Sequence, residues 1–195
     1  MINFAEFEFA AVLDLPDELP VFDLTESYEP EIIAAHRWGI GRYNEKRKQM
    51  YLAPQYEGRR DIHMGIDFWC PPGEPVYAFY DGEIAYFADN DQKGNYGPTI
   101  VTRHRLDGVE LFALYGHLTR ASVDGIARGQ PVSKGDRLGA VGTSDVNGGW
   151  APHLHFQISM EDPGKADMPG VVADDDLEEA LEKYPDPRLI VGSVY

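Results

Sequence analysis

The sequence predicts a mostly β protein made of short antiparallel strands, with an acidic N-terminal extension and a short C-terminal helix. Between about residues 60 and 160, short runs of β-branched and aromatic residues alternate with turn residues, which is typical of strands joined by tight turns. Twenty Gly and 14 Pro, spread along the chain without a period, supply such turns. Because 43% of the 195 residues are hydrophobic, we expect one packed core.

The chain divides into a central domain and two extensions. Residues 1–57 are acidic and interrupted by prolines, and we expect them to pack on the core. Residues 58–160 carry the predicted strands and form the central domain. Residues 161–195 form the C-terminal extension, in which acidic residues at the start of Asp174–Tyr184 favour a helix that Pro185 ends.

Local patterns predict the remaining elements. In the N-terminal extension, two adjacent isoleucines indicate a short helix near Pro30–Arg37, and a basic stretch, Arg42–Lys48, follows a glycine-rich break. In the central domain, the β-rich runs predict strands at His63–Phe68, Val76–Tyr80, Gly82–Phe87, Thr99–His104, Leu111–His117, Arg137–Val141 and His153–Ser159.

The charge and composition exclude several classes of partner. With 33 acidic and 17 basic residues the formal net charge is −16, so nucleic acid is excluded and adhesion to anionic membranes or polymers is disfavoured. Cys70 is the only cysteine, so an internal disulfide is excluded. No stretch resembles a signal peptide or a membrane span. We therefore expect a cytoplasmic chain as written, and an extracytoplasmic one if a longer chain supplies an export signal.

Three short patterns in the central domain contain four of the six histidines: His63-Met-Gly-Ile-Asp67, Tyr115-Gly-His117-Leu118 and His153-Leu-His155. Because side chains alternate faces along a strand, we expect His63, Gly65 and Asp67 to share one face. The same alternation places His153 and His155 together. Gly65 then leaves open the volume above its strand, which a metal ion could occupy.

Two imidazoles and one carboxylate form a ligand set that suits Zn²⁺ and leaves a fourth position for water, as in catalytic zinc sites. The candidates are Asp67 and four histidines, His63, His117, His153 and His155. Imidazoles that do not bind metal would act as a general base and as donors to the oxyanion that forms when a carbonyl is attacked. His36 and His104 are expected to be structural or exposed.

Further motifs accompany the histidine patterns over Gly58–Met160, about half of the chain. They are Gly73-Glu-Pro-Val-Tyr-Ala78, Asp81-Gly-Glu-Ile84, Gly94-Asn-Tyr-Gly97 before Ile100–His104, and Val132–Gly139. Together they resemble the lysostaphin/LytM-like zinc metallopeptidases, which cut peptide bonds in bacterial cell-wall cross-bridges. This resemblance implies an antiparallel β-sheet groove of the duplicated hybrid motif type, closed by loops.

By the same resemblance, His63, Asp67 and His155 would bind zinc, while His153 and His117 would flank the metal-bound water. His153 would be the base and His117 the oxyanion donor, although the two roles could exchange. The candidates for substrate contact come from loops and strand ends beside these histidines. They are Asn95, Tyr115, for which a packed aromatic is an equal alternative, and Trp150, which we expect to line or narrow the cleft.

The resemblance implies a zinc-dependent endopeptidase that hydrolyses Gly- or D-amino-acid-containing peptides of the peptidoglycan type. One alternative is a non-catalytic binding or regulatory module of the same fold, and another is a cytoplasmic peptidase with a non-wall substrate. A further alternative is a group carrier, because Val132–Asp136 resembles lipoyl- and biotinyl-type turns around Lys134. The ending Tyr184–Gly192 resembles a subgroup in which such a domain is joined to kinase-like and aminotransferase-like domains.

Overall fold

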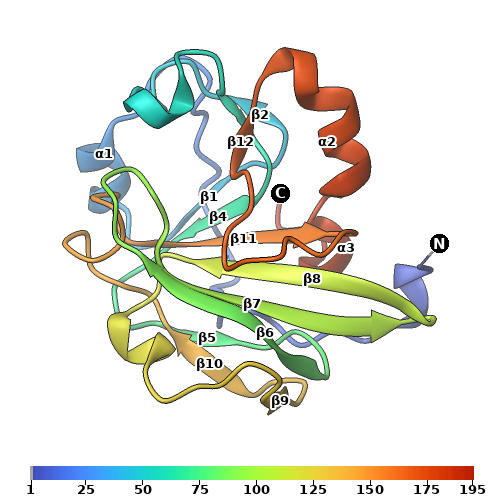
Figure 1. Cartoon of the computed structure of the whole chain (residues 1–195). Helices are drawn as coiled ribbons and strands as arrows, with labels where there is room; N and C mark the ends of the chain where they lie inside the picture. Colours follow the sequence, from blue (N-terminus) through green and yellow to red (C-terminus); the bar gives the residue numbers. More distant parts are fainter. Residues whose placement is uncertain (1) are drawn as a thin grey trace.

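The structure is a computed structural model that describes residues 2–195. Its centre is a seven-stranded antiparallel sheet in the order β1-β4-β11-β8-β7-β6-β9 (Figure 1). The strands are β1 (Gly39–Gly41), β4 (Ile66–Trp69), β6 (Gly82–Asn90), β7 (Gly97–Leu106), β8 (Val109–Gly116), β9 (Pro131–Val132) and β11 (His153–Ser159).

Two smaller antiparallel sheets lie beside the main one. The first pairs β5 (Pro75–Tyr77) with β10 (Arg137–Ala140). The second places β3 (Ile62–His63) between β2 (Glu45–Lys46) and β12 (Val171–Val172). Because β2 and β12 come from the two extensions, both extensions hold the strand that carries His63.

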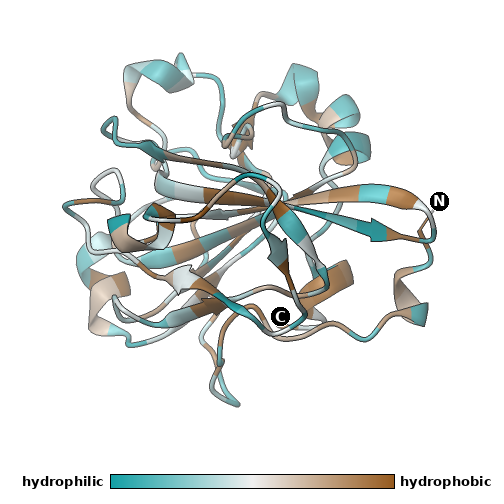
Figure 2. Ribbon diagram, turned by 60° about the horizontal axis from the view of Figure 1, so that its bottom comes forward, coloured by the Kyte–Doolittle hydropathy of each residue, from teal (hydrophilic) through white to brown (hydrophobic). Residues whose placement is uncertain are grey.

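The main sheet is buried on both faces. Along β8, Leu111, Ala113 and Tyr115 join one hydrophobic cluster, whereas Phe112 and Leu114 join another. The first cluster includes the N-terminal extension and the β5–β10 sheet, and the C-terminal extension covers the second. Figure 2 shows that the hydrophobic colours lie mainly on strands and the hydrophilic colours on the loops between them. The histidines of β11 share the face of the second cluster, since Leu154 and Phe156 belong to the first.

The α-helices are short and belong to the extensions. They are α1 (Pro30–Ala35), α2 (Leu177–Lys183) and α3 (Arg188–Val191). The 3₁₀ turns are η1 (Phe4–Glu6), η2 (Pro54–Tyr56), η3 (Arg120–Val123) and η4 (Asp174–Asp176), of which η3 lies in the central domain. The predicted C-terminal helix is confirmed, because η4 continues into α2 and ends before Pro185. Within residues 2–195, none of the helices has the length and apolar character needed to span a bilayer.

The predicted fold class, mostly antiparallel β with a short C-terminal helix, is confirmed. The single strand predicted at His63–Phe68 is wrong: β3 and β4 belong to different sheets, and Met64 and Gly65 separate them. Strands β1, β2, β9 and β12 were not predicted, because two or three residues are too few to show an alternating pattern.

His104 is a buried structural histidine, as expected from the sequence. Its Nδ1 donates to the Asp81 carbonyl at 3.0 Å, and its Nε2 accepts from the Thr102 hydroxyl at 2.6 Å. Burial lowers the pKa of His104 from 6.5 to about 4. The neutral ring is therefore the form that the fold accommodates.

The low pKa of His104 predicts a loss of stability in acid. His104 binds a proton near pH 6.5 in the unfolded chain and only near pH 4 in the folded chain. Its contribution to the free energy of unfolding is therefore fully present above pH 6.5 and is lost between pH 6.5 and 4. The loss amounts to about 3 kcal/mol. Urea unfolding in EDTA at a series of pH values checks this. Between pH 6.5 and 4, the free energy of unfolding of His104→Gln should fall by about this amount less than that of the wild type. The exposed His36 supplies the control, and His36→Gln should keep the wild-type pH dependence; equal slopes for all three proteins would refute the prediction.

Candidate metal centre

Strand pairing brings the histidine motifs to one end of the main sheet. In the β4–β11 register, Asp67 lies opposite His155. Strand β11 also pairs with β8, which ends one residue before His117. His63 closes the short strand β3, immediately before β4. These side chains and His153 are each at most 4% exposed, so their surroundings are set by the protein rather than by bulk water.

Three side-chain atoms of this cluster form a small triangle. His63 Nε2 lies 3.1 Å from His155 Nδ1, and His155 Nδ1 lies 3.0 Å from Asp67 Oδ1. The third side, from His63 Nε2 to Asp67 Oδ1, is 3.3 Å. The sequence placed two histidines and this carboxylate together, and the structure brings them within contact of one another.

Hydrogen bonds at the far ring nitrogens fix which atoms carry protons. His63 Nδ1 lies 2.8 Å from the Arg42 carbonyl, which can only accept, so Nδ1 is protonated and Nε2 has a lone pair. His155 Nε2 lies 3.1 Å from Gln157 Oε1, whose amide nitrogen is used on the Pro169 carbonyl. Nε2 of His155 is therefore the donor and Nδ1 has the lone pair.

The triangle consequently consists of three acceptor atoms that face one another. Burial opposes ionisation of Asp67, but its neighbours, His63 and Arg47 first among them, hold the pKa of this carboxyl well below its usual range. Burial also lowers the pKa of His63 to about 4. A carboxylate oxygen and two imidazole nitrogens about 3 Å apart, each imidazole hydrogen-bonded at its other nitrogen, form a site that a metal cation would satisfy.

The dimensions of the triangle fit zinc. Tetrahedral zinc binds nitrogen and oxygen at about 2.0–2.2 Å, which places its ligand atoms about 3.3–3.6 Å apart. The sides of the triangle, 3.0–3.3 Å, are only slightly shorter. The three ligands, with both imidazoles already in the required tautomer, would hold the ion and leave a fourth position, as catalytic zinc sites do.

Gly65 makes room for a ligand rather than for the ion itself. A Cβ at this position would lie 2.5 Å from His155 Cε1, 2.6 Å from His155 Nε2 and 2.9 Å from the Phe156 carbonyl. The expectation that Gly65 leaves space for a metal ion is therefore wrong in detail, because the His155 imidazole fills that space. The residue still has to be small for the site to form.

A Gly65→Ala substitution should displace the His155 ring. We expect zinc affinity to fall by about 10- to 100-fold, the range for changes that misplace a ligand, and overpacking to cost about 1–3 kcal/mol of stability. Gly139→Ala is the matched control, since its Cβ would contact Ser122 and none of the side chains of the cluster. Chelator competition and thermal unfolding should show that both variants are destabilised and that only Gly65→Ala binds zinc weakly.

His117 and His153 stand beside the triangle with their rings 4.1 Å apart. His117 Nδ1 donates to the Asn147 carbonyl at 2.9 Å, and His153 Nδ1 donates to the Ala151 carbonyl at 2.7 Å. Each ring therefore presents a lone pair at Nε2. Burial lowers the pKa of His117 well below its usual range and also lowers that of His153. Both imidazoles are thus neutral and able to accept a proton.

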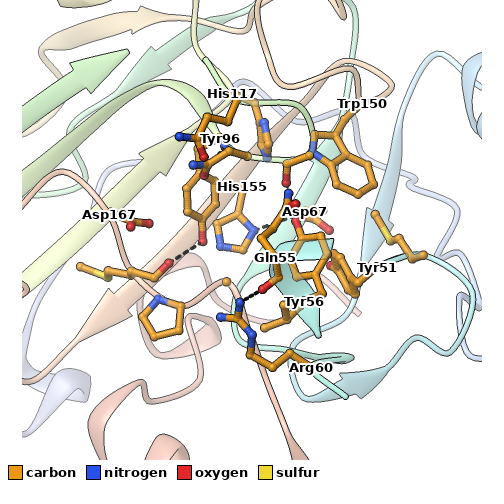
Figure 3. A pocket seen from close by; sticks show the side chains of 18 of the residues that line it. Tyr51, Gln55, Tyr56, Arg60, Asp67, Tyr96, His117, Trp150, His155 and Asp167 are labelled. Carbon is orange, nitrogen blue, oxygen red and sulfur yellow. Dashed lines mark hydrogen bonds and ion pairs between the residues drawn. The ribbon is translucent and has the colours of Figure 1, made fainter. Parts of the chain in front are cut away.

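A pocket of about 320 Å³ opens in front of these groups (Figure 3). Asp67, His117, His153 and His155 form its floor. Its walls come from residues 50–60, 92–96 and 165–171, which include parts of both extensions, and from Trp150. Two of the three predicted substrate-contact residues, Asn95 and Trp150, line it. Trp150 packs against Tyr28 and Tyr51, with ring centroids 5.8 and 5.9 Å away, and so forms one rim.

Tyr115 does not reach the pocket, and its prediction as a substrate contact is wrong. The side chain is fully buried in the cluster on the opposite face of the sheet, with its ring 5.3 Å from that of Phe156. Residues 115 and 117 would share a face in a regular strand, but β8 ends at Gly116 and His117 has a φ of 64°. This left-handed conformation turns His117 toward the pocket and away from the side of Tyr115.

Several site residues were missed by the sequence patterns. Arg47, Tyr51 and Tyr96 contact or line the site, and Gln157 holds the tautomer of His155. Gln157 lies two residues after His155, on the same strand face, so alternation could have found it. Arg47 lies in the basic stretch of the N-terminal extension. Its place beside Asp67 depends on the β1–β4 pairing, which no local sequence pattern predicts.

A buried His₂Asp cation site with two further imidazoles at an open pocket defines the class of metal-dependent hydrolases. Residues 61–167 match the model of peptidase family M23. The chain belongs to this family, and the resemblance seen in the sequence is confirmed.

Two relatives and one solved structure illustrate the match. The chain is 39% identical over 100 residues to the DD-carboxypeptidase/endopeptidase Mpg of Neisseria meningitidis serogroup B, covering 51% of this chain and 20% of that protein. It is 32% identical over 139 residues to the peptidoglycan DD-endopeptidase ShyB of Vibrio cholerae serotype O1, covering 69% and 29%. The catalytic domain of lysostaphin from Staphylococcus simulans is 22% identical, with a TM-score of 0.48, covering 79% and 98%. The chain thus spans less than a third of the two relatives' length.

Proposed function

We propose that this chain is a zinc-dependent endopeptidase that hydrolyses amide bonds in peptidoglycan-type peptides containing Gly or D-amino acids. The observation that carries the proposal is the triangle of ligand atoms from His63, Asp67 and His155, of which Asp67 and His155 line an open pocket. Membership of peptidase family M23 supports the reaction class. The names of the relatives, which include peptidoglycan DD-endopeptidases, support the substrate class.

The two remaining imidazoles would manage protons. When bound, zinc polarises a carbonyl and lowers the pKa of water to about 7. His153, whose Nε2 lone pair lies 3.7 Å from Asp67 Oδ1, would take a proton from the attacking water and pass it to the leaving amine. His117 presents a lone pair while neutral and would donate to the developing oxyanion only after its Nε2 has gained a proton. The two roles can therefore exchange.

The pocket supports an extended peptide as substrate. Four aromatic residues line it, Tyr51, Tyr56, Tyr96 and Trp150, and they offer flat apolar surfaces for a peptide backbone or small side chains. The walls contributed by both extensions enclose the floor and limit the width of what can enter. Small residues such as Gly or D-Ala suit such a cleft.

The test combines metal analysis with a substrate screen. Purified protein should contain close to one zinc per chain and should cleave peptidoglycan fragments in preference to ordinary L-peptides, as followed by mass spectrometry. EDTA should abolish cleavage and zinc should restore it. A zinc-loaded protein that cleaves neither substrate would favour the binding-module alternative, and cleavage of L-peptides alone would favour a peptidase with a non-wall substrate. The cellular location and the link to kinase-like and aminotransferase-like domains stay predictions.

The group-carrier alternative gains no support from the surroundings of Lys134. Its backbone N–H donates to Asp81 Oδ1 at 2.7 Å, and its Nζ donates to the Glu8 carbonyl at 3.2 Å. Both contacts are those of a lysine in a β-turn that packs against the N-terminal extension. The intact mass of the expressed protein checks this, since a modified lysine would add the mass of the attached group.

A further inference from the structure

Arg47 is a completely buried arginine directly behind the metal-binding triangle. Its Nη1 donates to Asp67 Oδ2 at 2.7 Å, and its Nε donates to Glu45 Oε2 at 2.9 Å. Nη1 also donates to the Tyr51 hydroxyl at 3.0 Å, and Nη2 to the Arg42 carbonyl at 3.3 Å. These contacts use both edges of the planar guanidinium, so its orientation is fixed.

The two oxygens of Asp67 are thereby divided between different partners. Oδ1 is the corner of the triangle, 3.0 Å from His155 Nδ1 and 3.3 Å from His63 Nε2. Oδ2 points the other way and accepts from Arg47. A carboxylate that is free to turn can bind a cation through both oxygens, whereas one whose second oxygen is held by a charged donor offers only the first.

The chain around Arg47 is shaped to admit the guanidinium. A Cβ at Gly41 would lie 2.6 Å from Arg47 Nη2 and 2.6 Å from the Trp69 ring, so only glycine leaves room there. Gly41 belongs to β1, which pairs with β4, and in this register Gly41 lies directly opposite Asp67. This segment of the N-terminal extension precedes residues 61–167, which match the family model.

We propose that Arg47 is a positioning residue for the metal site: it holds Asp67 Oδ2 so that the carboxylate binds the metal through Oδ1 alone. One coordination position is thereby kept free for water and substrate. The inference rests on the proposed metal site. It also makes the segment around residues 41–51 part of the metal centre, although this segment lies outside the family match.

A purely structural ion pair is the competing explanation. In that case Arg47 would only connect the N-terminal extension to β4, and its loss would lower stability without changing how the metal is bound. Metal affinity and the mode of carboxylate binding separate the two explanations, because neither depends on peptidase activity. If the wild-type chain binds no zinc, the proposed function is wrong and the inference about Arg47 fails with it. If the wild type binds zinc and the Arg47 variants bind it equally well, only the inference about Arg47 is wrong.

The experiment compares two substitutions with a control from the same segment. Arg47→Lys keeps the positive charge but lacks the fork that reaches Asp67, Glu45 and the Arg42 carbonyl together. Arg47→Met removes the charge. Lys48→Met is the control, since Lys48 is exposed and pairs with the surface residue Glu26 at 2.7 Å. Zinc affinity is measured by chelator competition, and the stability of the metal-free proteins by urea unfolding.

We expect Arg47→Met to bind zinc about 10- to 100-fold more weakly than the wild type, as for loss of an outer-shell partner. Arg47→Lys should recover part of this loss, and Lys48→Met should match the wild type. In a cobalt-substituted protein, the visible bands of Arg47→Met should weaken, because a carboxylate that binds through both oxygens raises the coordination number. Wild-type zinc affinity and cobalt bands in both Arg47 variants would overturn the inference, whatever happens to stability.

A measurement on the wild type decides the matter even if Arg47→Met does not fold. The infrared difference spectrum between zinc-loaded and metal-free protein reports the two carboxylate stretches of the ligand. Binding through one oxygen separates them widely, and binding through both brings them together. A wide separation supports the division of Asp67 between metal and Arg47, whereas a narrow one would refute it.

Discussion

A His63→Ala variant is expected to lose zinc binding and, with it, all metal-dependent cleavage. His63 Nε2 is one of three ligand atoms, and its lone pair is directed at the site by the hydrogen bond from Nδ1 to the Arg42 carbonyl. Removing it leaves one imidazole and one carboxylate, too few for a stable zinc site. Zinc affinity should therefore fall by more than about 100-fold, beyond the loss typical of an outer-shell partner.

The same substitution should remove the stabilisation that zinc gives the fold. Zinc at 1,000 times its dissociation constant stabilises a native protein by about 4 kcal/mol, which raises the Tm of a domain of this size by roughly 8–16 °C. Thermal unfolding with zinc and with EDTA should show this shift for the wild type and for His36→Ala, which removes an exposed histidine. A zinc-dependent shift of wild-type size in His63→Ala would exclude this residue as a ligand.

The central part of the site could be predicted because its residues lie only a few positions apart in short sequence motifs. His153 and His155 lie on one strand, two residues apart, and alternation alone places them on one face. The motif from His63 to Asp67 was predicted for a partly wrong reason, since the chain breaks between β3 and β4. Asp67 meets His155 through the pairing of β4 with β11, whereas His63 is held on β3 by its pairing with β2 and β12.

The features that were not predicted depend on tertiary structure. His117 reaches the pocket because its φ is 64°, and nothing in the neighbouring sequence requires this conformation. The error about Tyr115 has the same cause. The pocket walls from residues 50–60 and 165–171 are distant in sequence from the histidines they enclose, and hydrophobic periodicity says nothing about such long-range contacts. The fold class was predictable since it depends on the many strands that do show periodicity.

A His153→Ala variant is expected to keep its zinc and lose most of its activity. Of the two histidines in His153-Leu-His155, only His155 belongs to the triangle, with its Nδ1 3.0 Å from Asp67 Oδ1. His153 Nε2 lies farther from that oxygen, at 3.7 Å, and its Nδ1 is used on the Ala151 carbonyl. The ligand set should thus survive, and the loss of a general base should lower kcat by about 10²–10⁴-fold.

Zinc content and steady-state kinetics on a peptidoglycan fragment check this together. Full zinc content with a lower kcat and little change in KM is the expected result, because His153 contacts the reacting water and not the rest of the substrate. His117→Ala provides the comparison: loss of an oxyanion donor costs about 10²–10³-fold in kcat, so a larger loss there than in His153→Ala would indicate that the two imidazoles exchange roles. If His153→Ala instead loses its zinc, ligand and base are interchanged within the motif, and the triangle in the metal-loaded protein must include His153 in place of His155.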